Sequence, residues 1–286
     1  MSFWQLRNEI WHLPKKGAIM GILNVTPDSF SDGGAYNTQE KALHKAEQML
    51  IEGADIIDIG GESTRPGAAS VATEEELQRT IPIISALRAH FPHIRLSIDT
   101  RHFEVAEQAL LAGADIVNDI GGLGDPAMRK VCSKHPCGII LMHMQGTPST
   151  MQVTPNYEDV VAEVRAFFEH RLKIAASEGI CPERICLDPG IGFGKTCEHN
   201  LALIRHLSSL RVQNRPLMMA LSRKRFMGEL LNDPIIVKES PLPTVALSLL
   251  AAEKGADLHR VHDVAPLVQA LTLRWAVKGD IDDCTV

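Results

Sequence analysis

Short apolar runs alternate along the chain with longer segments in which apolar residues recur at helical spacing. Eight runs are apolar enough to be buried strands, and polar or glycine-containing sequence follows each: residues 18–23, 54–59, 94–99, 114–119, 138–143, 184–188, 216–221 and 256–262. Between them lie segments with the periodicity of amphipathic helices, including residues 38–53, 73–91, 102–113, 157–179 and 243–255. Apolar strands that alternate with helices predict a parallel sheet covered by helices.

The tripeptide Gly-Ala-Asp stands at three junctions between a helix and the next strand, at residues 53–55, 113–115 and 255–257. Glycine readily adopts the left-handed backbone that ends a helix, so each tripeptide predicts a helix end followed at once by a strand. Eight strand–helix units in 286 residues predict an α/β fold, a single-domain (β/α)8 TIM barrel. An open, doubly wound sheet is the alternative, because the same alternation occurs in both folds.

No linker rich in proline or serine divides the chain, which favours one barrel domain over residues 17–278. Residues 1–16 are expected to form an N-terminal cap segment that covers the bottom of the barrel or makes a short hairpin. Residues 279–286 are expected to be a frayed tail.

Composition narrows the class of protein. A net charge of −6, with 45% hydrophobic and 22% charged residues, is typical of a soluble globular domain and gives no support to nucleic-acid binding. The six cysteines lack metal-finger spacing, and no signal peptide or apolar run of ~20 residues is found, so we expect a cytoplasmic protein without a membrane segment. A Ser-His-Asp order, a zinc-binding His-Glu-x-x-His helix and a dinucleotide glycine fingerprint are all missing from the sequence.

Side chains that form hydrogen bonds follow the apolar runs. They are Asn24, Glu62 to Arg65, Asp99, Asn118, His143, Asp188, Ser222 to Lys224, Arg260 and His262. Any one of them could simply cap the next helix. In a (β/α)8 barrel, however, the carboxyl ends of all strands meet at one face, which carries the functional site. The mixture of carboxylates, amides and cations predicts a ligand with a hydrogen-bonding edge and a negatively charged portion.

Three loops refine that expectation. In the loop at 58–68, Arg65 could hold phosphate oxygens with two hydrogen bonds, although a solvated turn is the alternative. At 221–230, cations precede a helix start, which is either an anion site or a solvated helix end. Asp188 opens a glycine-rich loop, and a buried carboxylate there requires a partner such as the paired N–H groups of an amidine-like edge.

The stretches "GILNVTPDSFSDGG" and "DIGGESTRPGA" together resemble the two signature loops of the dihydropteroate synthase family. The resemblance continues in order through "SIDT", "VNDIGG", "LMHMQGTPSTMQ", "LDPGIGFGK", "SRKRFMG" and "RVHDV", and covers about residues 17–278. It implies a (β/α)8 transferase of folate synthesis. Such an enzyme joins 6-hydroxymethyl-7,8-dihydropterin diphosphate to 4-aminobenzoate and, with Mg²⁺ assisting, yields 7,8-dihydropteroate and diphosphate.

The resemblance also implies residue roles. The pterin would be bound by Asp99, Asn118, Asp188, Lys224, Met142 and Phe193, and the diphosphate by Thr64, Arg65, Arg260 and His262. Phe30, Pro66 and Ser222 would bind 4-aminobenzoate, and Asn24 would bind the metal. Asp99, Lys224 and Arg65 would be the catalytic residues of a dissociative, SN1-like substitution, with the loop that carries Phe30 closing over the substrates.

Other features of the sequence concern ligand fit, drug sensitivity and self-association. Ala220 stands where the family usually has glycine, which concerns ligand fit rather than activity. The second loop has no insertion of the kind carried by sulfonamide-insensitive relatives, so we expect sulfonamide sensitivity. A homodimer is expected, although the apolar segment at 245–255 more simply serves the barrel. The alternatives for function are a pterin-binding methyltransferase domain and a non-catalytic pterin-binding homologue.

Overall fold

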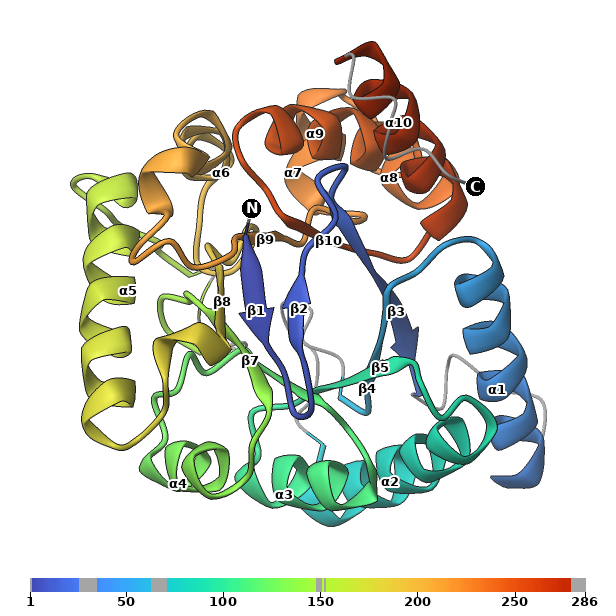
Figure 1. Ribbon diagram of the computed structural model, residues 1–286. Coiled ribbons are helices and arrows are strands. Elements are labelled where there is room, and N and C mark those ends of the chain that lie inside the picture. The colour runs from blue at the N-terminus through green and yellow to red at the C-terminus, as the bar shows by residue number, and fades with distance from the viewer. Residues whose placement is uncertain (1, 26–34, 63–70, 148–150, 152, 279–286) are drawn as a thin grey trace.

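Eight parallel strands form a barrel in the computed structural model, which describes residues 2–25, 35–62, 71–147, 151 and 153–278 (Figure 1). The strands are β3 (Ala18–Asn24), β4 (Ile56–Gly60), β5 (Arg95–Asp99), β6 (Ile116–Asp119), β7 (Gly138–Met142), β8 (Ile185–Asp188), β9 (Met218–Met219) and β10 (Leu258–Val261). Their order is β8-β7-β6-β5-β4-β3-β10-β9, and a parallel bridge between Leu187 and Leu217 joins the two outer strands. The predicted (β/α)8 barrel is therefore confirmed, and the doubly wound alternative is wrong.

Helices surround the barrel on all sides (Figure 1). They are α1 (Ala35–Ile51), α2 (Thr73–His90), α3 (Phe103–Ala112), α4 (Pro126–Lys134), α5 (Val160–Ser177), α6 (Cys197–Arg205), α7 (Arg225–Leu230), α8 (Ile236–Glu239), α9 (Leu242–Glu253) and α10 (Val264–Val277), with 3₁₀ turns η2 (Pro182–Arg184) and η3 (Leu207–Leu210). Every residue of β4 and of β7 is buried, which explains why these strands are apolar without alternation. Among the described residues, no helix has the length and apolar character needed to cross a membrane.

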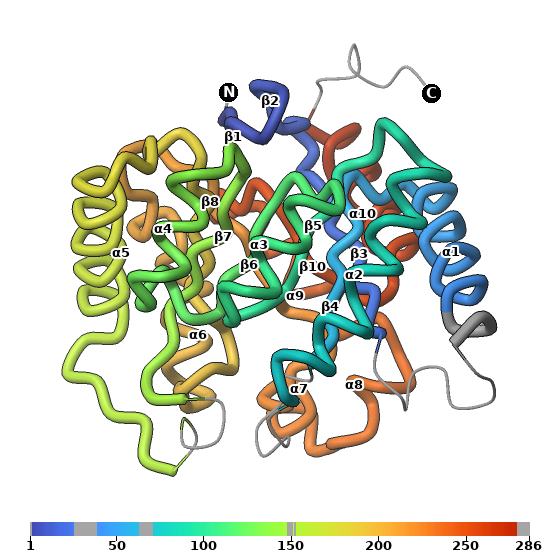
Figure 2. The backbone as a smooth tube through the Cα atoms, turned by 90° about the horizontal axis from the view of Figure 1, so that it is seen from below, coloured from blue at the N-terminus to red at the C-terminus, as the bar shows by residue number. Residues whose placement is uncertain are grey.

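A two-stranded antiparallel hairpin, β1 (Phe3–Gln5) and β2 (Ile10–His12), covers one end of the barrel (Figures 1 and 2). Its buried side chains pack in one cluster with residues from the starts and interiors of the strands: Trp4, Leu6, Trp11, Leu13, Ala18, Met20, Ile56, Ile116, Ile140, Cys186, Met218 and Leu258. The Trp4 indole also donates a hydrogen bond of 2.8 Å to the Arg184 carbonyl. The hairpin thus fills the amino-terminal end of the barrel, which leaves the opposite rim for polar side chains.

The three Gly-Ala-Asp tripeptides share one structure. Their glycines have φ values of 101°, 114° and 100°, in the left-handed region that the sequence predicts. Each following aspartate accepts a hydrogen bond from the neighbouring strand: Asp55 from the Ile19 N–H (2.8 Å), Asp115 from the Leu96 N–H (3.0 Å) and Asp257 from the Leu217 N–H (2.8 Å). The tripeptide therefore ends a helix and fixes the start of the adjacent strand, which sets the register of the rim residues further along.

We predict that Asp115→Ala lowers the free energy of unfolding by about 1–3 kcal/mol, because the Leu96 N–H and the Arg88 guanidinium (2.5 Å from Asp115) lose their acceptor. Asp115→Asn retains an acceptor for Leu96 and is expected to lose less. Urea unfolding of the three proteins measures the difference. Equal midpoints for Asp115→Ala and the parent chain would show that this contact does not stabilise the barrel.

Candidate active site

Strand register brings four rim residues to one level. In the parallel ladder Asn24 is paired with Gly60, Gly60 with Asp99, and Asp99 with Asn118. Around the same rim, Met142 of β7 is paired with Asp188 of β8. Residues predicted from five separate apolar runs therefore line one end of the barrel, at the ends of β3, β5, β6, β7 and β8.

Arg260 of β10 joins two buried carboxylates inside this rim. Its Nε donates to Asp58 Oδ2 and its Nη2 to Asp99 Oδ2, both at 2.6 Å. Asn118 Nδ2 donates to the same oxygen of Asp58 at 3.2 Å. Asp58 is 0% exposed and Asp99 is 7% exposed, so water screens these charges little. One guanidinium thus connects β10 with β4 and β5.

Burial raises the pKa of Asp99 to about 7; Arg260 opposes this rise, and the negative charge of Asp58 adds to it. Because its pKa is raised, Asp99 takes up a proton more readily than an exposed aspartate, and once protonated it can donate as well as accept a hydrogen bond. Within the described residues, the second oxygens, Asp58 Oδ1 and Asp99 Oδ1, are buried without a hydrogen-bond partner. Such acceptors are costly to leave unpaired, and a ligand with N–H groups would satisfy them.

Asp58 is a candidate site residue that the sequence pattern did not indicate. It lies in the middle of an apolar run rather than at its end, so it reads as part of a buried strand. The available signal was its charge, because an ionised side chain is rarely buried without a partner or a function.

A second set of polar groups lies after β8. Asp188 is buried and accepts a hydrogen bond of 2.8 Å from the Gly190 N–H, and its burial raises its pKa. The Lys224 ammonium lies 4.3 Å from the centre of the Phe193 ring, a cation–π contact. Burial lowers the pKa of Lys224 to about 8, and the negative charge of Asp188 opposes that shift. Phe193, Lys224 and Asp188 therefore form one wall of the site.

Ser222 and His262 form a pair at the ends of β9 and β10. Ser222 Oγ lies 2.9 Å from His262 Nδ1 and accepts the His262 backbone N–H at 3.2 Å. Helix α7 begins at Arg225, directly after the predicted Ser-Arg-Lys sequence. Arg223 has a φ of 57° and its guanidinium is 3.0 Å from Asp263, so this turn is held in an uncommon left-handed conformation.

The remaining predicted residues divide into two groups. Phe30, Thr64, Arg65 and Pro66 lie outside the residues that the structure describes. Asn24 is described and is half-buried at the end of β3. A Cβ placed on Gly60 would lie 3.6 Å from Asn24 Oδ1 and 3.8 Å from Asp99 Oδ2. The two oxygens therefore flank the position of Gly60 on either side. The Asn24 amide oxygen is a hard ligand of the kind that Mg²⁺ prefers, and Mg²⁺ keeps water or phosphate oxygens in its other positions.

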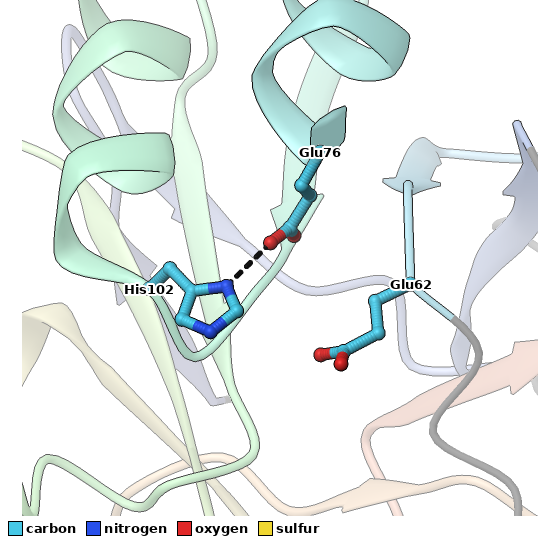
Figure 3. A group of neighbouring side chains, drawn as sticks. All are labelled: Glu62, Glu76 and His102. Carbon is cyan, nitrogen blue, oxygen red and sulfur yellow. Dashed lines mark hydrogen bonds and ion pairs between the residues drawn. The ribbon is translucent and has the colours of Figure 1, made fainter. Parts of the chain in front are cut away.

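Glu62, Glu76 and His102 form a neighbouring group whose potential metal-ligating atoms lie within 4.8 Å of one another (Figure 3). His102 Nδ1 is 2.6 Å from Glu76 Oε2. Glu62 already accepts two hydrogen bonds of 3.1 Å from Arg101 and one of 3.1 Å from the Val71 N–H. These contacts brace the end of β4 against α2 and the start of α3, and the two glutamates add to the rise in the pKa of Asp99.

Comparison with known proteins assigns the family. A model of pterin binding enzymes matches residues 20–262. The dihydropteroate synthase of Synechocystis sp. is 50% identical over 256 residues, which are 89% of this chain and 88% of that protein.

Two solved structures agree in fold. The dihydropteroate synthase of Yersinia pestis, solved with a sulfonamide drug, has a TM-score of 0.89 at 42% identity and covers 97% of this chain and 99% of its own. The dihydropteroate synthase of Burkholderia cenocepacia, solved with 7,8-dihydropteroate, has a TM-score of 0.87 at 40% identity and covers 97% of each chain. With the family model matching from within β3 to just past β10, the chain belongs to the dihydropteroate synthases of the pterin-binding enzyme family.

Proposed function

We propose that this chain condenses 6-hydroxymethyl-7,8-dihydropterin diphosphate with 4-aminobenzoate to give 7,8-dihydropteroate and diphosphate. The observation that carries the proposal is the convergence of three buried carboxylates, Asp58, Asp99 and Asp188, with the cations Arg260 and Lys224 at one rim of the barrel. A pterin offers N–H donors and ring acceptors on one edge, and this arrangement is complementary to it. The relative from Burkholderia cenocepacia, whose chain aligns along 97% of this one, was solved with 7,8-dihydropteroate.

Pterin binding is assigned to the buried end of the site. The unpaired oxygens of Asp58 and Asp99, together with Asp188, would accept the N–H groups of the pterin. Lys224 would donate to a ring nitrogen or oxygen, and the Asn118 amide can both donate and accept. Phe193 and Met142 would pack against the flat ring faces.

The chemical step replaces a carbon–oxygen bond with a carbon–nitrogen bond. In an SN1-like path, diphosphate leaves with the bonding electrons, and the positive charge that develops on the pterin methylene is delocalised into the electron-rich ring. Asp99, when ionised, would stabilise that charge electrostatically. The arylamine nitrogen then attacks the methylene and loses one proton to diphosphate or water, so positioning matters more than a strong base.

Leaving-group stabilisation is assigned to the outer part of the site. A guanidinium has five N–H donors, so Arg260 has donors beyond its two carboxylate bonds for a diphosphate oxygen. Thr64, Arg65 and His262 would contribute the other contacts. Asn24 would hold Mg²⁺, which when bound neutralises charge on the diphosphate. Arg65 is the group that we expect to act most strongly on the leaving group.

The second substrate is assigned to the start of α7. Ser222 and the N–H groups that follow it would receive the carboxylate of 4-aminobenzoate, with Phe30 and Pro66 closing over its ring. Sulfonamides would compete there as analogues, consistent with the drug complex of the Yersinia pestis relative. The buried methyl group of Ala220 lies two residues before Ser222 and would affect the fit of ligands.

The rival functions are less well supported. A pterin-binding methyltransferase domain would share the barrel and the pterin pocket, but it would not require two long rim loops and a Ser-Arg-Lys helix start. A non-catalytic homologue would be expected to lose Arg65, Lys224 or Arg260, and the sequence retains all three.

We also propose that the protein is a cytoplasmic homodimer. Large apolar side chains are exposed on two adjacent helices, with Leu242 and Leu250 of α9 at 69% and 54%, and Leu273 and Val277 of α10 at 69% and 88%. Exposed apolar side chains of this kind are typical of protein–protein contact surfaces, which supports self-association through these helices.

The direct test of function is diphosphate release. We expect the chain to release diphosphate from the pterin substrate only when both Mg²⁺ and 4-aminobenzoate are present, in proportion to dihydropteroate formed. A sulfonamide should compete with 4-aminobenzoate. Release that does not depend on 4-aminobenzoate, or full turnover under saturating sulfonamide, would contradict the assignment.

Two variants separate the pterin site from the diphosphate site. Asp188→Asn is expected to weaken binding of a pterin without phosphates by about 10- to 100-fold, because it removes the charged half of a hydrogen-bonded pair. Arg65→Ala is the matched control, expected to lower turnover strongly while leaving that affinity nearly intact. Calorimetric titration measures both. Loss of binding in Arg65→Ala would show that the division of the site is wrong.

A further inference from the structure

The loop between β8 and α6 packs unusually closely on the chain that follows β7. Gly190, Gly192 and Gly194 all have left-handed φ values, of 67°, 83° and 61°. A Cβ on Gly190 would lie 1.8 Å from the His143 carbonyl oxygen, and one on Gly194 would lie 2.5 Å from the Gln145 carbonyl oxygen. Gly190 and Gly194 are therefore required by contact as well as by conformation, and Gly192 by conformation.

Lys195 is the cation buried beneath this loop. Lys195 is only 3% exposed. Its Nζ lies 2.9 Å from His143 Nδ1 and donates a hydrogen bond of 2.9 Å to the Phe193 carbonyl. A third, longer contact of 3.4 Å reaches the His143 carbonyl. Burying an ammonium is costly unless its donors are used, and these three contacts with His143 and Phe193 offset that cost.

We propose that Lys195 is a positioning residue of the pterin site, which joins His143 to the Phe193 carbonyl and thereby fixes the Phe193 wall and Asp188 relative to each other. The inference rests on the proposed function and goes beyond it, since neither Lys195 nor His143 contacts the pterin in that assignment.

His143 connects Lys195 with Asp188 through its own hydrogen bonds. The His143 backbone N–H donates to the Asp188 carbonyl at 2.9 Å, so one residue holds both the Lys195 side chain and the end of β8. On the other side of the loop, the Phe193 ring supports the Lys224 ammonium at 4.3 Å. Displacement of Lys195 would therefore move Phe193, Lys224 and Asp188 together, and these three form the wall assigned to the pterin.

The Lys195 contact also fixes the form of the imidazole. An ammonium can only donate, so while Lys195 is protonated His143 Nδ1 accepts and the ring proton lies on Nε2. Burial, with the charge of Lys195, lowers the pKa of His143 to about 3, so the ring stays neutral. Burial also lowers the pKa of Lys195 to about 7, against the effect of Asp188, so Lys195 is charged mainly below that pH. The ring packs edge-on to Phe167, with centroids 4.9 Å apart, which holds its plane.

Steady-state kinetics of Lys195→Met test the proposal. This variant keeps the length of the side chain and removes its donors. We expect the KM for the pterin diphosphate, and the Kd for a pterin without phosphates, to rise about tenfold or more, while the KM for 4-aminobenzoate is unchanged. Equal rises in both KM values would indicate only a general structural role and would overturn the proposal.

A pair of His143 variants provides the control for folding. His143→Asn retains an acceptor close to the position of Nδ1 and is expected to rescue pterin affinity, whereas His143→Leu should behave like Lys195→Met. If Lys195→Met fails to fold, the two His143 variants test the proposal in its place. A His143→Leu protein that folds and binds the pterin with normal affinity would overturn it.

Nitrogen-15 NMR of the imidazole gives a readout that packing alone would not change. At about pH 6, where Lys195 is charged, the His143 proton is expected on Nε2 in the parent chain, and this preference should be lost in Lys195→Met. A proton on Nδ1 in the parent chain would overturn the proposal. Failure of the parent chain to release diphosphate would instead contradict the proposed function, so the two failures are distinguishable.

Discussion

Two buried carboxylates share one guanidinium in the interior of the barrel. Arg260 brings β10 into contact with Asp58 of β4 and Asp99 of β5, which lie on strands distant in sequence from it. Without this cation, two negative charges would repel each other where water screens them little. The interaction holds three strands at fixed positions and leaves one oxygen of each carboxylate without a hydrogen-bond partner among the described residues. In the proposed function, the acceptors for the pterin N–H groups are therefore in place before the substrate arrives.

The other side of the site places one buried carboxylate near two buried lysines, without an ion pair among the described residues. Asp188 lies among Lys195 and Lys224, and both lysines are buried enough that their pKa values fall. Glycines with left-handed backbone allow the loop to approach closely, so that Lys195 reaches His143. Carboxylates and cations therefore lie near one another around the rim. Such preorganised polar groups lower the free energy of a transition state because little reorganisation is needed when charge develops.

Sequence patterns predicted the barrel and much of its rim for physical reasons. Strands buried on both sides must be continuously apolar, and parallel strands must end on one face, so Asn24, Asp99 and Asp188 could be expected together. Asp58 was missed because it interrupts an apolar run instead of ending it. The role inferred for Lys195 depends on how two loops pack, which no periodicity encodes. The sharing of Arg260 between two carboxylates likewise depends on barrel closure rather than on local sequence.

Titration of the Asp99 carboxyl by carbon-13 NMR tests the central claim most directly. Sharing of Arg260 by two buried carboxylates predicts a pKa of about 7 for Asp99 in the ligand-free chain, because burial, the largest effect, and Asp58 raise this pKa while Arg260 lowers it. It also predicts a further rise in Arg260→Met and a fall in Asp58→Asn. An Asp99 pKa near the ordinary value of about 4, unchanged in both variants, would contradict the account.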